Sequence, residues 1–167
     1  MKKFVLFIAL SFTGFLFGQN TIEILGKTNV NSFKCSNSNL PHPAIRISGA
    51  NFSLPDFKVE VDGFDCANKI MTKDFKATLK SDQYPTINID FTSFNKTNTG
   101  KYACWANVTL MNRAKKYYFE FTLASNNQLI GSRTIKFSDF GIAPPKKMGG
   151  MIRVDDNLNL KFKLKVN

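Results

Sequence analysis

The amino-acid sequence predicts a mainly β fold, an eight-stranded antiparallel barrel with one short helix inserted between the early and the late strands. Residues 158–166 alternate apolar and polar side chains without interruption, a period of two that places a strand between an apolar interior and water. Shorter alternating runs, separated by turn residues, recur between residues 57 and 137. Eight antiparallel strands are enough to close a barrel that holds one small ligand.

The first 18 residues are typical of a secretory signal peptide. Lys2 and Lys3 precede an almost wholly apolar run over residues 4–17, which ends at Gly18. The run is about six residues shorter than the roughly 20 that a bilayer-spanning helix needs. We therefore expect cleavage near Gly18, export to the periplasm or beyond it, no stable membrane span, and one domain over residues 19–167.

The early part of the mature chain contains three extended segments and the helix. Residues 21–35 are interpreted as one long extended segment, and shorter strands are expected at residues 44–48 and 57–61. Residues 68–80 are the predicted helix. Their apolar residues fall near helical spacing, Asn68 is suited to cap the start, and no proline or glycine interrupts the segment.

The late part of the chain repeats a pattern of strand and turn. Strands are predicted at residues 86–91, 101–111, 116–124 and 128–137, followed by a final hairpin of residues 150–154 and 158–166 with a turn at residues 155–157. In the closing strand, five side chains are expected to face the interior: Leu158, Leu160, Phe162, Leu164 and Val166. Lys161, Lys163 and Lys165 are expected on the outside.

Three cysteines follow the predicted signal peptide. Cys35 ends the first extended segment and Cys66 follows a later one, so a Cys35–Cys66 disulfide is expected if these segments lie side by side. It would close a loop of about 30 residues and stabilise the fold by roughly 3–4 kcal/mol. The alternative is that all three cysteines are reduced. Cys104, in an apolar strand, is interpreted as a buried free thiol.

The residue chemistry gives no sign of a catalytic or metal site. The chain carries a formal charge of +11, but its lysines are spread along strands and turns without a nucleic-acid motif, which predicts a solvated basic surface and no nucleic-acid partner. The single histidine, His42, lacks ligand partners at suitable spacing. Asp155 and Asp156 fit a turn better than a glycosidase pair or a calcium loop. We therefore expect no enzyme activity, no metal and no cofactor.

Three segments of the chain resemble the YceI-like family. Residues 71–87 resemble its short helix, tyrosine–proline step and following strand; residues 135–145 resemble its late Asp-Phe-Gly segment; residues 26–35 fit its secreted, flavobacterial-type branch. The resemblance implies an exported, lipocalin-like barrel. It also implies that the lumen holds a long isoprenoid chain, such as a polyprenyl quinone or a carotenoid precursor.

Large aromatic side chains on all sides of a small barrel either fill the lumen or line a slot for a flexible apolar chain. Seven inward-pointing residues are the candidate ligand-binding set: Phe91, Trp105, Phe119, Phe121, Phe137, Leu160 and Phe162. Three residues near the mouth are candidates for contact with a polar head group: Tyr84, Tyr117 and Arg133. A cavity of roughly 300 Å³ or more would distinguish a container from a solid barrel.

Two hypotheses about function follow. The first is an exported, non-enzymatic binding protein that holds an isoprenoid or another long apolar lipid in the barrel lumen. The second is a filled barrel, a structural or interaction protein that presents its lysine-rich face to an anionic surface or a protein partner. Added salt should weaken the second kind of binding and leave the first unchanged. The sequence leaves a homodimer open.

Overall fold

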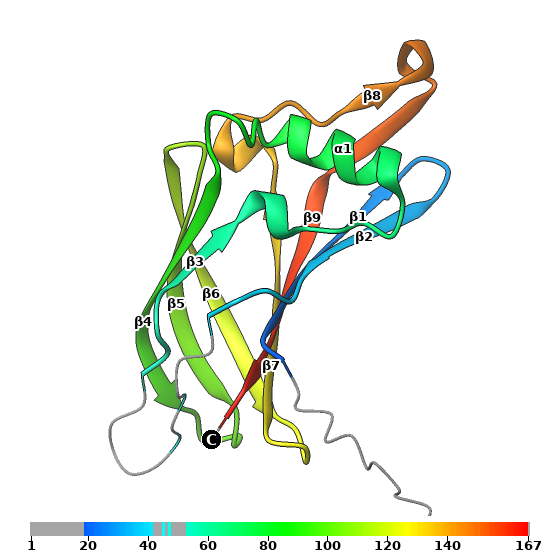
Figure 1. Cartoon of the computed structure of the whole chain (residues 1–167). Coiled ribbons are helices and arrows are strands. Elements are labelled where there is room, and N and C mark those ends of the chain that lie inside the picture. Colours follow the sequence, from blue (N-terminus) through cyan, green and yellow to red (C-terminus); the bar gives the residue numbers. More distant parts are fainter. Residues whose placement is uncertain (1–18, 42–44, 46, 48–52, 167) are drawn as a thin grey trace, which may run out of the picture.

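The computed structural model describes residues 19–41, 45, 47 and 53–166 (Figure 1). The predicted signal peptide and His42 lie outside these residues. The strands are β1 (Thr21–Thr28), β2 (Ser32–Asn37), β3 (Phe57–Glu60), β4 (Thr86–Lys96), β5 (Tyr102–Leu110), β6 (Arg113–Leu123), β7 (Gln128–Lys136), β8 (Lys146–Lys147) and β9 (Ile152–Lys165). The helix α1 spans Lys69–Thr78, and three 3-10 turns are η1 (Val61–Gly63), η2 (Ser138–Phe140) and η3 (Met148–Gly150).

The strands form one curled sheet in the order β2-β1-β9-β7-β6-β5-β4-β3, with β8 added beside β9. The pairings between neighbouring strands are antiparallel. Figure 1 shows the sheet curling into a half-barrel, with α1 lying across its upper end. The predicted mainly β, eight-stranded antiparallel fold with one inserted helix is confirmed.

The segment predicted as one long strand, residues 21–35, is a hairpin of β1 and β2. The chain reverses after Thr28, whose backbone N–H donates to the Asn31 carbonyl at 2.7 Å. The Thr28 hydroxyl also accepts hydrogen bonds from the backbone N–H groups of Val30 and Asn31. This local hydrogen bonding by a threonine hydroxyl explains why the strand ends there.

The turn predicted at residues 155–157 is also wrong. These residues continue β9, a strand of 14 residues, which pairs with β1 on one side and β7 on the other. The hairpin reverses earlier, where Gly149 and Gly150 have φ angles of 64° and 93°, values that glycine adopts at little cost. Asp156 instead accepts hydrogen bonds from the backbone N–H and the hydroxyl of Ser138.

The inward side of β9 agrees with the prediction. Leu158, Leu160, Phe162 and Leu164 are buried, and Val166 beyond the strand is half-buried. The strand predicted at residues 44–48 is described at two positions, of which Ile45 forms an isolated parallel bridge with Val166. Positions 44, 46 and 48 of this prediction lie outside the described residues.

A disulfide closes the seam between the two edges of the curled sheet. Cys35 on β2 is bonded to Cys66, which confirms the predicted pairing. Beside it, Ser36 and Asp65 exchange two backbone hydrogen bonds of 2.8 and 2.9 Å. Cys104 is buried and free, and burial raises the pKa of its thiol to about 12, so it is not a reactive nucleophile at neutral pH.

A cluster of phenylalanine rings fills the lower half of the barrel. Phe162 on β9 lies 5.3 Å from Phe119, 5.5 Å from Phe91 and 6.0 Å from Phe121, measured between ring centroids. Phe121 packs directly over Gly131, where a Cβ atom would lie 2.6 Å from a ring carbon. This aromatic plug leaves the upper half, under α1, as the part of the interior that could open.

The outer face of β9 and β1 carries a buried carboxylate. Glu23 is 6% exposed and accepts a 2.8 Å hydrogen bond from the Lys163 ammonium, with Lys34 at 3.9 Å. Burial opposes ionisation of Glu23, but Lys163 and the neighbouring Lys34 and Lys161 together hold the pKa of the carboxyl below its ordinary value of 4.5. Lys163 is therefore partly neutralised.

Removing this carboxylate should make stability less dependent on pH. Because the pKa of Glu23 is lowered in the folded state, its contribution is complete above about pH 4.5 and is lost as the pH falls through the folded-state pKa. We expect Glu23→Gln to cost about 1–3 kcal/mol at pH 7 and much less at pH 3. Urea unfolding of both proteins at the two pH values measures this. An equal cost at both would contradict the assignment.

Candidate apolar binding site

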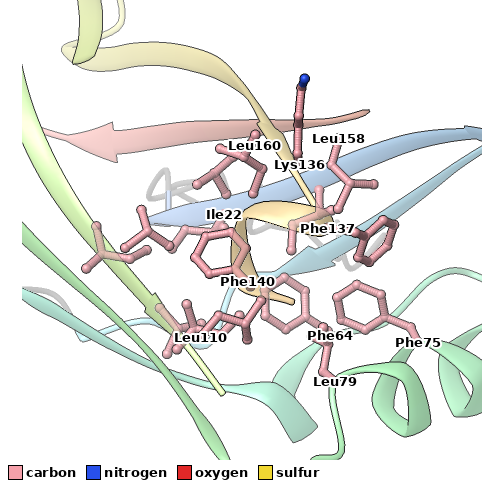
Figure 2. Close-up of a pocket in the computed structure, with 16 residues that line it drawn as sticks. Ile22, Phe64, Phe75, Leu79, Leu110, Lys136, Phe137, Phe140, Leu158 and Leu160 are labelled. Carbon is pink, nitrogen blue, oxygen red and sulfur yellow. The ribbon is translucent and has the colours of Figure 1, made fainter. Parts of the chain in front are cut away.

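The upper half of the barrel contains a cavity of about 30 Å³. Figure 2 shows Phe75 and Leu79, from the helix segment, pointing toward Phe64 and the sheet. The sheet contributes aliphatic side chains, among them Ile24, Val108, Leu110 and Leu160, and the segment around η2 adds Phe137 and Phe140. Apart from the side chain of Lys136, the lining is apolar.

The volume of this cavity sets a limit on what the barrel holds in this conformation. About 10–15 Å³ of such space admits one water molecule, whereas ligand sites usually enclose about 300–1,000 Å³. At about 30 Å³, the cavity is too small for a lipid chain. In this conformation the interior is a nearly filled barrel.

A second hollow lies outside the cavity, between α1, the β1–β2 turn and the β8–β9 hairpin. This groove has a volume of about 170 Å³, and its walls include Met71 on α1, Phe33 on β2 and Ile152 on β9. Phe75 and Phe137 line both the groove and the cavity. The two rings therefore stand in the wall that separates the groove from the interior.

The helix is attached to the barrel mainly at its first turns. The Asn68 carboxamide oxygen accepts hydrogen bonds from the backbone N–H groups of Ile70 and Met71, which confirms the predicted cap. The Thr72 hydroxyl accepts from the backbone N–H of Cys66 at 3.0 Å, next to the disulfide. Further along, Phe75 is the buried side chain within the helix.

Two polar contacts hold the remainder of α1. The Lys147 ammonium on β8 lies 2.8 Å from the Asp74 carboxylate, and the Lys76 ammonium donates to the Asp62 carbonyl at 2.7 Å. Ion pairs with exposed partners each stabilise by about 0–1 kcal/mol. Apart from the Cys66–Thr72 hydrogen bond, the helix is therefore held to the barrel mainly by the burial of Phe75 and Leu79.

The predicted ligand-binding residues divide into three groups. Phe137 and Leu160 line the cavity. Four others belong to the aromatic plug: Phe91, Phe119, Phe121 and Phe162. Trp105 was predicted to point inward, and this is wrong, because its side chain is on the outer face and the residue is 41% exposed. There it lies edge-on to Tyr118, with the Lys116 ammonium 5.2 Å from its ring centroid.

The pattern of β5 explains the error at Trp105. The buried residues of this strand are Tyr102, Cys104, Ala106, Val108 and Leu110. The small side chains Cys104 and Ala106 face inward because Phe119 and Tyr117 stand opposite them on β6. The period of two thus places Trp105 outside, although it is the largest apolar residue of the strand.

The candidate head-group residues belong to β6, β7 and the segment after α1, and the Arg133 charge acts on the Tyr117 hydroxyl. The Tyr117 hydroxyl donates a 2.6 Å hydrogen bond to Asp139; burial and this bond raise the pKa of Tyr117. The same bond, with Lys115 at 3.4 Å, lowers the pKa of Asp139. Arg133 is exposed on β7, and Tyr84 is half-buried after α1. Their head-group role stays a prediction.

Several residues of the site were not singled out from the sequence. Phe64 follows η1, Phe140 belongs to η2, and Phe75 and Leu79 come from the helix segment. The helical spacing of Phe75 and Leu79 was a usable signal, because an amphipathic helix buries its apolar face. Phe64 and Phe140 stand in short irregular segments, where no periodicity indicates their direction.

The part of the chain that the structure describes contains neither a metal-binding cluster nor a membrane-spanning helix. No group of three or more histidine, cysteine or acidic side chains lies close enough together there to hold a metal ion. None of the helices in this part is both long and apolar enough to cross a membrane.

Comparisons with known proteins identify the family. The structure is similar to that of BcnA from Burkholderia cenocepacia, with a TM-score of 0.70 and 18% sequence identity over 86% of this chain and 94% of that one. It is also similar to a Campylobacter jejuni YceI protein, with a TM-score of 0.61 and 16% identity over 98% and 96% of the two chains. No curated protein sequence matches. The model of the YceI-like domain matches residues 20–166, so the chain belongs to the YceI-like family.

Proposed function

We propose that this protein is an exported, non-enzymatic binding protein that holds a long apolar chain, such as an isoprenoid, in the upper half of its barrel. The observation that carries the proposal is the adjacency of two apolar spaces, the cavity and the groove, which share Phe75 and Phe137 as walls. The Cys35–Cys66 disulfide supports export, since disulfides persist in oxidising compartments.

Binding requires α1 to move, and the energies permit it. Uncovering Phe75 and Leu79 costs about 1.5–3 kcal/mol for each side chain. An apolar chain of about ten methylenes gains roughly 8 kcal/mol on burial, before the entropy of association is counted. The ligand would also cover both side chains again. The cost of moving the helix, about 3–6 kcal/mol for the two side chains, is therefore smaller than the gain of about 8 kcal/mol from burying the chain.

Tying α1 to β8 should prevent binding. In an Asp74→Cys/Lys147→Cys variant, a short bismaleimide would join the two positions that the ion pair brings together. Buried Cys104 should not react. We expect the cross-linked protein to bind cis-parinaric acid, a fluorescent long-chain fatty acid, at least about tenfold more weakly than the same variant blocked with N-ethylmaleimide, a loss of about 1.4 kcal/mol.

The matched blocked form carries the same two substitutions and the same chemistry, so it controls for the lost ion pair. Equal affinity of the cross-linked and blocked forms would show that α1 does not move to admit the probe. The proposed entry route would then be wrong.

The filled barrel is the second candidate, and the aromatic plug with its small cavity favours it. In that case the outer lysines of β9 would contact an anionic surface or a protein partner. Lys163 is paired with Glu23, so the neighbouring Lys161 would contribute more to such a contact. Such binding should fade between low and physiological ionic strength, whereas binding of an apolar chain should not.

A further inference from the structure

Most of the exposed large hydrophobic side chains lie at one end of the molecule. Among the residues that the structure describes, six such side chains are exposed. Four of them, Val30, Ile70, Met148 and Met151, are between 63% and 74% exposed. They belong to the β1–β2 turn, the start of α1 and the β8–β9 turn, which meet at the upper end in Figure 1. We call these four side chains the apolar rim.

Contacts between the three segments hold the rim together. The Asn29 side chain donates to the Met151 carbonyl and accepts from the Arg153 backbone N–H, both at 2.9 Å, so the β1–β2 turn is docked on the β8–β9 hairpin. The Lys147–Asp74 ion pair joins that hairpin to α1. The three segments that carry the rim are therefore joined to one another.

The three segments that carry the rim also contribute to the walls of the groove. The groove is lined by Asn31, Met71 and Ile152, which are sequence neighbours of Val30, Ile70 and Met151. An exposed apolar group of this kind on a chain of this size marks an interaction site. Its position at the groove indicates that the partner and the bound chain meet here.

Charge indicates the kind of partner. Five cations stand in the same three segments and are exposed: Lys69, Lys73, Lys146, Lys147 and Arg153. Lys147 neutralises Asp74, and Asp62 and Asp65 line the same hollow as Lys69 and Lys73, so the cations outnumber the acids without being free of them. Exposed apolar tips flanked by lysines fit the interface of an anionic bilayer, where the tips enter the acyl boundary and the lysines meet phosphate head groups.

We propose that the apolar rim and its lysines dock this protein on the surface of an anionic phospholipid bilayer, with the groove facing the membrane. This extends the proposed function, because a chain could then pass between bilayer and barrel without crossing water. Docking is nevertheless measurable without any ligand in the barrel.

The test is co-sedimentation of residues 19–167 with vesicles of phosphatidylglycerol and phosphatidylcholine in equal amounts. We expect the protein to partition onto these vesicles, less strongly as salt is added and far less strongly onto vesicles of phosphatidylcholine alone.

Met148→Asp/Met151→Asp should lower partition onto the anionic vesicles by about tenfold or more. Met148 has a positive φ, which aspartate tolerates well, so the variant should fold. Leu123 is an exposed residue at the end of β6, and the β6–β7 turn lies at the lower end in Figure 1. Leu123→Asp is therefore the matched control and should bind normally.

The lysines provide an independent readout. Lys73→Gln/Lys146→Gln should lower partition by about fivefold for each lysine, whereas Lys58→Gln/Lys96→Gln on the strands should leave it unchanged. Absence of partition by the wild-type protein would overturn the proposal, and so would equal loss in the Leu123 variant. Loss caused by Lys161→Gln and not by the rim variants would assign binding to the sheet face instead.

A second copy of the chain is the rival occupant of the rim. A dimer in solution that Met148→Asp/Met151→Asp dissociates, without vesicle binding, would show that the rim is an interface between copies. Sedimentation velocity measures this. Because the vesicles contain no isoprenoid, failure to dock leaves the proposed lipid binding untouched, and failure to bind a chain leaves docking untouched.

Discussion

Replacing Phe162 with alanine is expected to lower the free energy of unfolding by about 3–5 kcal/mol. Phe162 is fully buried, and its ring contacts those of Phe91, Phe119 and Phe121. Its strand β9 pairs on both sides, with β1 and β7. The backbone therefore cannot move inward to fill the space that the ring leaves. The substitution then carries nearly the full free-energy cost of an unfilled cavity.

Urea unfolding followed by circular dichroism measures the loss, with Trp105→Ala as the control. Trp105 is the larger side chain, but it is 41% exposed on the outer face and should cost about 1 kcal/mol or less through its ring and lysine contacts. If the two substitutions cost the same, the aromatic plug is not the stabilising core of this barrel.

Removing the disulfide with Cys35→Ser/Cys66→Ser is expected to lower the free energy of unfolding by about 3–4 kcal/mol. The two cysteines are 31 positions apart in the sequence, so the unfolded chain gains the freedom of a loop of that length. The substitution should also loosen the start of α1, because the Cys66 backbone N–H donates to Thr72.

Two measurements separate these effects. Urea unfolding gives the loss of stability, and hydrogen exchange should rise in residues 61–80 while the β5–β6 pairing remains protected. Reduction of the wild-type protein with dithiothreitol should reproduce both results. An unchanged unfolding midpoint after complete reduction would contradict the role assigned to the seam.

The strands of the fold could be predicted where the side-chain pattern is regular. In β9, the alternation from Leu158 to Leu164 indicated both the strand and its buried face, because burial on one side and water on the other leave a period of two. The errors in strand boundaries lie at turns. Residues 155–157 resemble a turn in composition, yet they continue β9 across an irregularity in its pairing with β1. On the other side Asn157 pairs with Lys136 of β7, and the sequence does not reveal that pairing.

The candidate site was harder to predict than the fold. Leu160 and Phe137 do line the cavity. Phe119 and Phe162 also point inward, but they belong to the aromatic plug, so inward direction alone does not tell whether a residue lines a cavity or fills the interior. The free volume depends on how rings from four or more strands interlock. Phe75 closes the cavity from a helix far away in sequence, and no local pattern specifies that contact.

The most direct test of the central claim is the lipid content of the native protein. The protein should be purified without detergent from the envelope of the cells that produce it, extracted with organic solvent and analysed by mass spectrometry, with another exported protein purified in parallel as the control. We predict about one long-chain apolar lipid, of isoprenoid type, for each protein molecule. Extracts with no more lipid than the control would contradict the claim that this barrel holds a chain.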